Sequence, residues 1–397
     1  MRRLLRHRQN QGCGRRFQAR GRAAAPRLLV LLALLVLLVG CRREAGPAQQ
    51  TGLDFTPLPR VIAGEPRSYL LGFSALPPRP TVEGYKSAMD LAANYGEVLL
   101  IQRAPAWSSF LPGASVADEL ERTTLAERAA LADRRLKVMY AIDVFDPASR
   151  GRLAELPPKL EGQTLANPDL RRAFVQHARF VALNYRPAFL VLGVEVNAAF
   201  EVNPEAYDAY REAYAEAYAE VKVASPTTLV FPTFQYEQLL GLIPWEASHA
   251  PRWRLVEDYG GRMDLFGITT YPSFVFQSAR KVPSEYYTDA RAHTTLPIAF
   301  ASVGFASEAT REGLNSSTPP EQRRFLQRLF TDADTLRSPL VIWFAGRDPA
   351  NADSAPLDLI ASIGLRTSDD RAKDAWPAWE QAVNRPYAGE LPRAERR

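Results

Sequence analysis

The chain has 397 residues, of which 49 are lysine or arginine and 44 are aspartate or glutamate. Nine of the arginines lie in the first 41 residues, which hold no acidic residue, so the remainder has 40 basic and 44 acidic side chains. The pI of 9.2 therefore reflects the N-terminal segment. The remainder has no cationic excess that would indicate a nucleic-acid partner.

Residues 1–41 are predicted to be a secretory signal. Their apolar run, residues 28–39, has about a dozen residues, whereas a helix that spans a bilayer needs roughly 20. Residues 38–41 read Leu-Val-Gly-Cys, which resembles the lipobox of bacterial lipoproteins. The resemblance implies an exported protein attached by a lipid on Cys41 to a bacterial membrane, on its periplasmic or cell-surface side. The alternative is an uncleaved membrane anchor with a chance cysteine. Cys13 is the only other cysteine, so the exported part can form no internal disulfide.

Residues 42–67 are polar, contain proline and glycine, and are interpreted as a tether. From there to residue 390, short apolar runs alternate with amphipathic stretches, which is typical of repeated βα units. The eight runs are Tyr69–Ser74, Val98–Gln102, Lys137–Ile142, Phe189–Gly193, Thr228–Pro232, Leu265–Thr269, Pro297–Ala301 and Leu340–Phe344. Near-continuous apolarity suits parallel strands that are covered on both faces. The sequence therefore predicts an α/β fold with one domain over 68–390, a single (β/α)8 TIM barrel.

Three of the intervening helices have recognisable starts. Asn167-Pro168 and Asn203-Pro204 each offer a cap followed by a proline, and residues 318–321 resemble a capping box. Four tyrosines then recur at intervals of three and four residues between positions 207 and 218. We interpret this stripe as the face that an outer helix packs on the barrel, with its hydroxyls reaching water at the rim.

Several reaction classes lack their motifs. The chain has no glycine-rich phosphate loop or dinucleotide fingerprint after a strand, and neither a HExxH nor a GxSxG motif. Beyond the signal there are three histidines, His177, His249 and His293, which lie far apart and are predicted to be on the surface. We therefore expect no metal site, no cofactor and no catalytic triad.

Glu195 is the main catalytic candidate. It follows the fourth apolar run, and this fold places its active site where the strands end. Burial beside aromatic rings would raise the pKa of a carboxyl group there, as a general acid requires. The alternative is a structural carboxylate that is satisfied by backbone groups or by an arginine.

Over residues 69–383 the layout resembles the clan A glycoside hydrolases, retaining (β/α)8 enzymes that include the endo-β-1,4-galactanases. In that clan an Asn-Glu pair ends strand four and its Glu is the acid/base; here Val194 stands in place of the Asn, and Glu195 is kept. Tyr271 after strand six is similar to the tyrosine that contacts the nucleophile, and Trp343 ends strand eight as an aromatic residue does in the clan. The segment 364–376 looks like the closing segment of such barrels. The resemblance implies an oligosaccharide or polysaccharide as the partner.

The nucleophile position departs from the clan. Strand seven would carry a Glu there, and this chain has Ser302. A serine hydroxyl cannot stabilise an oxocarbenium-like transition state as a carboxylate does. Glu308, six residues on, is the candidate second carboxylate, and Asp143 and Asp348 are others at the mouth. The full set of candidate substrate-binding residues is Trp107, Asp143, Asn197, Gln235, Tyr236, Tyr271, Trp343 and Asp348.

Three functions remain open. The first is a monomeric, membrane-anchored barrel that binds a glycan and has lost the clan's catalytic pair. The second is an active glycosidase with Glu195 as acid and a non-standard second carboxylate. The third is an unrelated hydrolase on the same barrel, since a fold does not fix a function.

Overall fold

The computed structural model describes residues 55–309, 316–350, 352 and 357–392. The predicted signal, Cys41 and the first part of the predicted tether lie outside these residues. Within them, no helix is long and apolar enough to cross a membrane.

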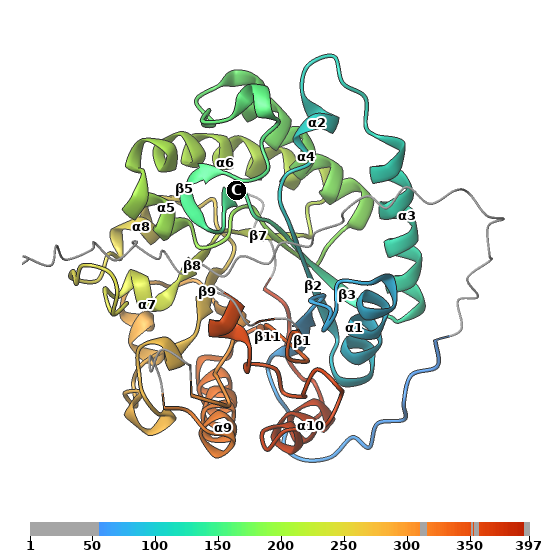
Figure 1. Cartoon of the computed structure of the whole chain (residues 1–397), viewed down its shortest axis with the longest axis vertical. Coiled ribbons are helices and arrows are strands. Elements are labelled where there is room, and N and C mark those ends of the chain that lie inside the picture. The colour runs from blue at the N-terminus through green and yellow to red at the C-terminus, as the bar shows by residue number, and fades with distance from the viewer. Residues whose placement is uncertain (1–54, 310–315, 351, 353–356, 393–397) are drawn as a thin grey trace, which may run out of the picture.

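The described residues form a parallel barrel with helices around it (Figure 1). Nine strands follow one another in the order β7-β6-β3-β2-β1-β11-β10-β9-β8. They are β1 (Leu70–Ser74), β2 (Val98–Arg103), β3 (Lys137–Ile142), β6 (Phe189–Val191), β7 (Leu229–Phe231), β8 (Thr233–Gln235), β9 (Phe266–Thr270), β10 (Ile298–Val303) and β11 (Leu340–Trp343). The predicted (β/α)8 barrel is thus confirmed, and each of the eight apolar runs overlaps a strand.

The barrel closes through a strand that is broken in two. Only Pro232 separates β7, which pairs with β6, from β8, which pairs with β9. Proline has no backbone N–H to donate to a ladder, so the ladder is interrupted at that residue. The two edges of the sheet are therefore consecutive pieces of one chain segment.

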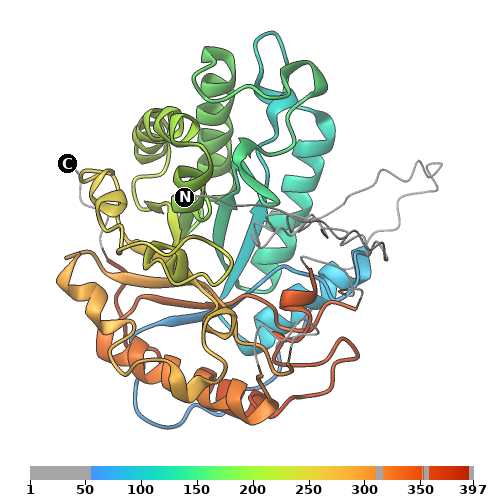
Figure 2. The same ribbon diagram turned by 60° about the vertical axis from the view of Figure 1, so that its left-hand side comes forward.

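The α-helices lie outside the strands, and α4 and α9 flank the barrel on opposite sides (Figure 2). The α-helices are α1 (Val82–Tyr95), α2 (Trp107–Phe110), α3 (Asp118–Asp133), α4 (Pro168–Tyr185), α5 (Val196–Val202), α6 (Pro204–Ala224), α7 (Tyr236–Leu239), α8 (Arg254–Glu257), α9 (Pro319–Leu336) and α10 (Trp376–Asn384). The 3-10 helices are η1 (Pro158–Leu160), η2 (Pro272–Phe274), η3 (Ala279–Lys281), η4 (Thr288–Ala292) and η5 (Leu357–Ile360).

Two of the predicted helix starts have the expected caps. The Asn167 side chain accepts from the first-turn N–H groups of α4, and the Asn203 side chain accepts from Ala206 N at 3.1 Å. The predicted capping box at residues 318–321 was wrong. Helix α9 does begin there, but Thr318 makes no side-chain cap, and Glu321 accepts instead from the backbone N–H of Ala279 at 2.7 Å.

The tyrosine stripe of α6 packs on the barrel as predicted, but three of its four tyrosines are buried and only Tyr218 is partly exposed. Tyr210 and Tyr214 are buried, and their hydroxyls donate to the backbone carbonyls of Leu192 and Arg262 at 2.8 and 2.6 Å. A buried hydroxyl that finds a backbone acceptor avoids the cost of desolvation, so these residues join helix to barrel.

A β-hairpin that the sequence analysis did not predict follows β3. Its strands are β4 (Phe145–Asp146) and β5 (Ser149–Leu153), which pair in antiparallel fashion. Because β3 ends at residue 142, the hairpin lies at the C-terminal end of the barrel, and β5 contacts α5 (Figure 1). This insertion carries a residue into the mouth of the barrel.

The contacts of the barrel extend to residues that we interpreted as tether. Arg60 donates to the backbone carbonyls of Ala93, Asn94 and Gly96 at the end of α1. Arg67 is buried and pairs with Glu97. Residues 60 and 67, which the sequence analysis assigned to the tether, therefore pack on the barrel.

His177 is buried in the outer layer, against the prediction of a surface position. Its Nδ1 accepts from the backbone N–H of Ala106 at 3.3 Å, and the Phe110 ring stacks on it. Burial, helped by the charge of Arg103, lowers the pKa of His177 from 6.5 to about 3.

This depressed pKa predicts acid sensitivity. Between pH 6.5 and about 3 the unfolded chain binds a proton at His177 that the folded chain does not bind. Stability is therefore lost as the pH falls through this window. By about pH 4.5, two units below the ordinary pKa, the loss from this residue is about 3 kcal/mol. We expect His177→Gln, which can still accept from Ala106, to lose less stability than wild type between neutral pH and pH 4.5 in urea titrations. The exposed His293→Gln should behave as wild type does, and an equal loss in all three proteins would contradict the prediction.

Candidate active site at the barrel mouth

Glu195 is held at the C-terminal end of the barrel by an unusual backbone. It follows β6 and precedes α5 with φ 51° and ψ 47°, the left-handed region that non-glycine residues rarely occupy. Its N–H donates to Thr233 Oγ1 at 3.0 Å. Two residues earlier Gly193 has φ 150°, and a Cβ there would lie 2.3 Å from the Tyr210 hydroxyl, so only glycine fits. Strained backbone of this kind is typical of functional sites.

The carboxylate of Glu195 is bound by an arginine from the hairpin. Arg150 is fully buried, and its Nη2 donates to Glu195 Oε2 at 3.0 Å while its Nη1 donates to Asp143 Oδ1. The remaining oxygens are also occupied, because Thr269 Oγ1 donates to Glu195 Oε1 and Gln102 Nε2 donates to Asp143 Oδ2, each at 2.9 Å. One guanidinium therefore joins two buried carboxylates, each of which accepts on both oxygens.

This arrangement opposes acid catalysis by Glu195. A guanidinium has donors and no acceptor. A proton on Oε2 would therefore face an N–H group of Arg150. The Thr269 hydroxyl donates to the other oxygen, so each oxygen of Glu195 already accepts a hydrogen bond, and a leaving group would have to compete with these two donors.

Electrostatics keep the arginine of the cluster charged. Burial raises the pKa of Asp143 to about 6, and Arg150 limits the rise. Burial alone would lower the pKa of Arg150, but the two carboxylates outweigh it and raise that pKa above its ordinary value. The cation is thus retained between Asp143 and Glu195.

Tyr271 and Ser302 form a second pair at the mouth. The Tyr271 hydroxyl and Ser302 Oγ lie 2.7 Å apart, and both residues are buried. Ser302 is aligned with Thr269, the residue that contacts Glu195, just past a β-bulge in β10. Burial and then the charge of Glu195 raise the pKa of Tyr271 well above its ordinary value. The structure therefore brings together Glu195, Tyr271 and Ser302, and the tyrosine contacts a serine.

Glu237 is a buried carboxylate that sequence reasoning missed. It begins α7 just after β8 and is fully buried, and burial raises its pKa. Its donors are Gln235 Nε2 (2.6 Å), Thr270 Oγ1 (2.5 Å), Tyr271 N (3.1 Å) and Tyr286 Oη (3.1 Å). Glu237 therefore fixes the backbone from which the Tyr271 side chain reaches Ser302.

Several predicted sugar-binding side chains make structural contacts instead. Asn197 bonds to both the N–H and the C=O of Gln235. The ring N–H groups of Trp107 and Trp343 donate to the carbonyls of Ala154 and Ile363, and the Tyr236 hydroxyl donates to that of Tyr286. All three rings are almost wholly buried, so we leave them out of the candidate binding surface.

The two remaining carboxylates belong to a separate cluster. Asp348 forms an ion pair with Lys373 at 2.6 Å and accepts from Gly364 N at 2.9 Å. Burial raises the pKa of Asp348 to about 6, although Lys373 lowers it. Glu308 is exposed and contributes charge to this pair, and no contact links it to Glu195 among the described residues. Its proposed role as second carboxylate therefore gains no support.

A half-buried tryptophan at the mouth was also missed. Trp245 follows α7 and packs beside Phe274, whose ring stacks on Tyr271. Its Nε1 is buried and has no hydrogen-bond partner among the described residues. The sequence signal was a lone tryptophan in a long loop after strand five, which by itself is weak.

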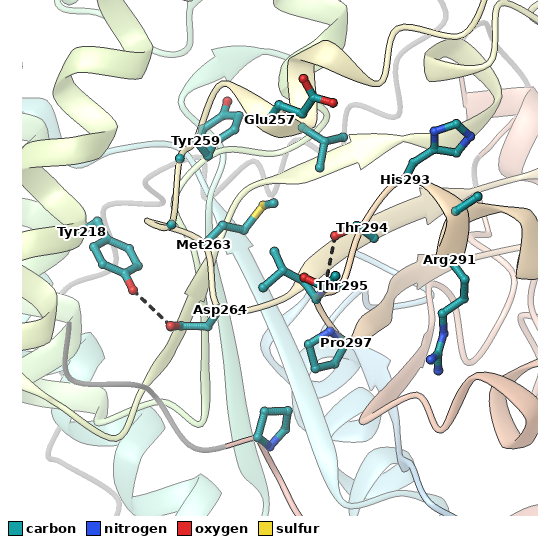
Figure 3. A pocket seen from close by; sticks show the side chains of 16 residues that line it. Tyr218, Glu257, Tyr259, Met263, Asp264, Arg291, His293, Thr294, Thr295 and Pro297 are labelled. Carbon is teal, nitrogen blue, oxygen red and sulfur yellow. Dashed lines mark hydrogen bonds between the residues drawn. The ribbon is translucent and has the colours of Figure 1, made fainter.

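A large hollow lies at the other end of the barrel. It has a volume of about 960 Å³ and is lined by residues that precede β9 and β10, among them Asp264 and Pro297 (Figure 3). Of the two carboxylates in its wall, that of Asp264 accepts from Tyr218 at 3.0 Å and pairs with Lys222, and that of Glu257 is exposed. The described residues contain no group of three or more His, Cys, Asp or Glu that could hold a metal ion.

The strands and helices together define the class of fold, a (β/α)8 barrel. No protein-family model matches the chain, and no curated protein sequence does.

Solved structures with the same fold include the exo-β-1,4-mannosidase Op5Man5 from Opitutaceae bacterium strain TAV5. It has 16% identity and a TM-score of 0.58, and the match covers 83% of this chain and 62% of that one. A variant of GH5_18 from Streptomyces cattleya in complex with Manb1-4GlcNAc has 16% identity, a TM-score of 0.58 and coverage of 83% of each chain. A family 39 glycoside hydrolase from Bacteroides cellulosilyticus WH2 has 15% identity, a TM-score of 0.53 and coverage of 80% and 64%. At these identities the likeness establishes the fold.

Proposed function

We propose that this chain is an exported, lipid-anchored protein that binds an oligosaccharide or polysaccharide at the barrel mouth without hydrolysing it by the retaining mechanism. The observation that carries the proposal is Arg150, which binds one oxygen of Glu195 and one of Asp143, together with the hydroxyl of Ser302 where a nucleophile is expected. The fold neighbours support carbohydrate as the ligand class, because GH5_18 structures contain Manb1-4GlcNAc or GlcNAc. Galactan-type chains remain candidates from the sequence resemblance.

Trp245 is the residue that we expect to contact the sugar. Sugars bind to flat apolar surfaces flanked by polar groups, and the half-buried indole ring of Trp245 offers such an apolar surface at the mouth. Trp245→Ala should weaken binding of the best oligosaccharide about tenfold or more, which is about 1.4 kcal/mol. The measurement is titration calorimetry over a panel with mannosyl-GlcNAc and galacto-oligosaccharides. Trp253→Ala is the matched control, because that half-buried tryptophan stacks on His293 before β10, away from the mouth.

Turnover is the second readout. Wild type should release no measurable aglycone from aryl β-glycosides, because the nucleophilic carboxylate is missing. Clear turnover that is abolished by Glu195→Gln but retained in Glu205→Gln, an exposed residue of α6, would overturn the proposal. Such turnover would favour an active glycosidase. Asp143, which shares Arg150 with Glu195, would then be the first residue to test as the second catalytic carboxylate.

The anchor has its own test. If Cys41 carries the lipid, Cys41→Ser should move the protein from the membrane fraction to the soluble fraction or leave it unprocessed. Mass spectrometry of the wild-type N-terminus should find a diacylated cysteine. An unmodified Cys41 within an intact leader would refute this part of the proposal.

A further inference from the structure

The end of the barrel opposite to the mouth carries a set of exposed cations. We use the name basal face for the loops at the N-terminal ends of the strands, each of which leads from a helix into the following strand. Figure 3 looks into the hollow between two of these loops, which enter β9 and β10. Four of the loops, including the first residue of β3, present exposed cationic side chains. These are Arg135, Lys137, Arg186, Arg262 and Arg337.

These cations have no acidic partner within the part of the chain that the structure describes. The acidic residues of the same loops are already paired: Glu97 with Arg60 and Arg67, Asp258 with Arg211, and Asp264 with Lys222. These loops are therefore locally cationic, although Glu390 lies in the same hollow as Arg337 and the exported part of the chain has more acidic than basic residues.

The N-terminal segment adds apolar side chains to the same face. Arg60 fixes this segment to the loop between α1 and β2, which belongs to the basal face. Leu58, Val61 and Ile62 on either side of it are 52%, 77% and 59% exposed. Arg337 shares the wall of a hollow with Pro66 of the segment, so the apolar and cationic groups are neighbours. Apolar side chains among cations fit the interface of an anionic bilayer.

The position of the predicted lipid anchor favours a bilayer as the partner of the basal face. The chain enters the described structure at Phe55, three residues before Leu58 of the N-terminal segment and only 14 residues after Cys41. Fully extended, these residues span at most about 50 Å. A lipid on Cys41 therefore keeps Phe55, at the start of the N-terminal segment, within about 50 Å of the bilayer.

We propose that the basal face docks on an anionic lipid bilayer and directs the barrel mouth away from it. The inference rests on the proposed lipid anchor. Each cation near an anionic surface contributes about 1 kcal/mol, so five suffice to orient a domain that is already tethered. The mouth is then presented to glycans outside the membrane surface.

Orientation can be measured on the lipidated full chain. Processing removes Cys13 and acylation occupies Cys41, so single introduced cysteines can be labelled selectively. Val61→Cys reports on the basal face, and Ala148→Cys on the exposed turn of the β4–β5 hairpin reports on the mouth. In vesicles of phosphatidylcholine and phosphatidylglycerol, doxyl-lipid should quench a fluorophore at residue 61 about twofold or more and leave residue 148 unchanged. In phosphatidylcholine alone the difference should disappear.

Charge reversal tests the cause. Arg135→Glu, Arg186→Glu and Arg337→Glu together should abolish the quenching at residue 61. The matched control reverses three exposed cations in or next to the mouth-side ends of helices: Lys86→Glu, Lys159→Glu and Arg172→Glu. Equal quenching at both probes, or equal effects of the two triple variants, would overturn the docking face while leaving the anchor intact. A chain without lipid in the mass spectrum would overturn both, so the two failures are distinguishable.

Discussion

Arg150→Met is expected to cost about 3–5 kcal/mol of folding free energy at neutral pH, because removal of one partner leaves buried charge uncompensated. Here the loss would expose two carboxylates, Asp143 and Glu195, to each other in a fully buried site. Methionine fills a similar volume, so the effect measures charge rather than a cavity. Urea unfolding followed by circular dichroism is the measurement.

Arg152→Met is the matched control, because this residue lies two positions along the same strand, is 61% exposed and pairs with Asp146 on the surface. The stability lost in Arg152→Met should stay within about 0.5 kcal/mol.

The direction in which the stability of Arg150→Met changes with pH is also defined. The pKa of Asp143 is raised to about 6 even with the arginine present, so protons bind the folded state more tightly than the unfolded state. In the variant, stability should therefore rise as the pH is lowered below neutral. A variant as stable as Arg152→Met would show that Arg150 does not hold this site together.

Glu237→Leu should cost about 3–5 kcal/mol as well. The substitution leaves four buried donors without their acceptor, and each unsatisfied polar group costs about 1–3 kcal/mol before the structure relaxes. The donors belong to Gln235, Thr270, Tyr271 and Tyr286, so strands β8 and β9 and the following loop are all affected.

Two comparisons make this prediction specific. Glu237→Gln keeps one acceptor oxygen and should lose less stability than the leucine variant. Glu257→Leu, the same change at an exposed residue of α8, should stay within about 0.5 kcal/mol. If Glu237→Leu unfolds at the same urea concentration as Glu257→Leu, the hydrogen bonds at this carboxylate contribute nothing net. Loss of oligosaccharide binding in Glu237→Gln would link the carboxylate to the position of Tyr271.

The sequence alone determined the barrel, because a parallel strand that is covered on both faces must be apolar nearly throughout. Lys137–Ile142 was predicted to the residue, and the asparagine caps of α4 and α6 were found because a cap is a local interaction. The location of Glu195 at the mouth also followed from the sequence, since each strand of this fold ends on the same side. The alternative reading of Glu195, a carboxylate satisfied by an arginine, describes its contacts in the structure.

Only the tertiary structure decided which arginine that is and what the site can do. Arg150 lies 45 residues before Glu195 in a polar stretch, and nothing local separates it from the exposed Arg152. Burial also decides which aromatic residues can bind a ligand. Trp107, Tyr236 and Trp343 were predicted to bind sugar, but they are buried and their polar atoms donate to backbone carbonyls. Periodicity reports which face of an element is apolar, whereas hydrogen-bond partners depend on how distant segments meet. The sequence therefore fixes the scaffold, and the contacts across it set the chemistry of the mouth.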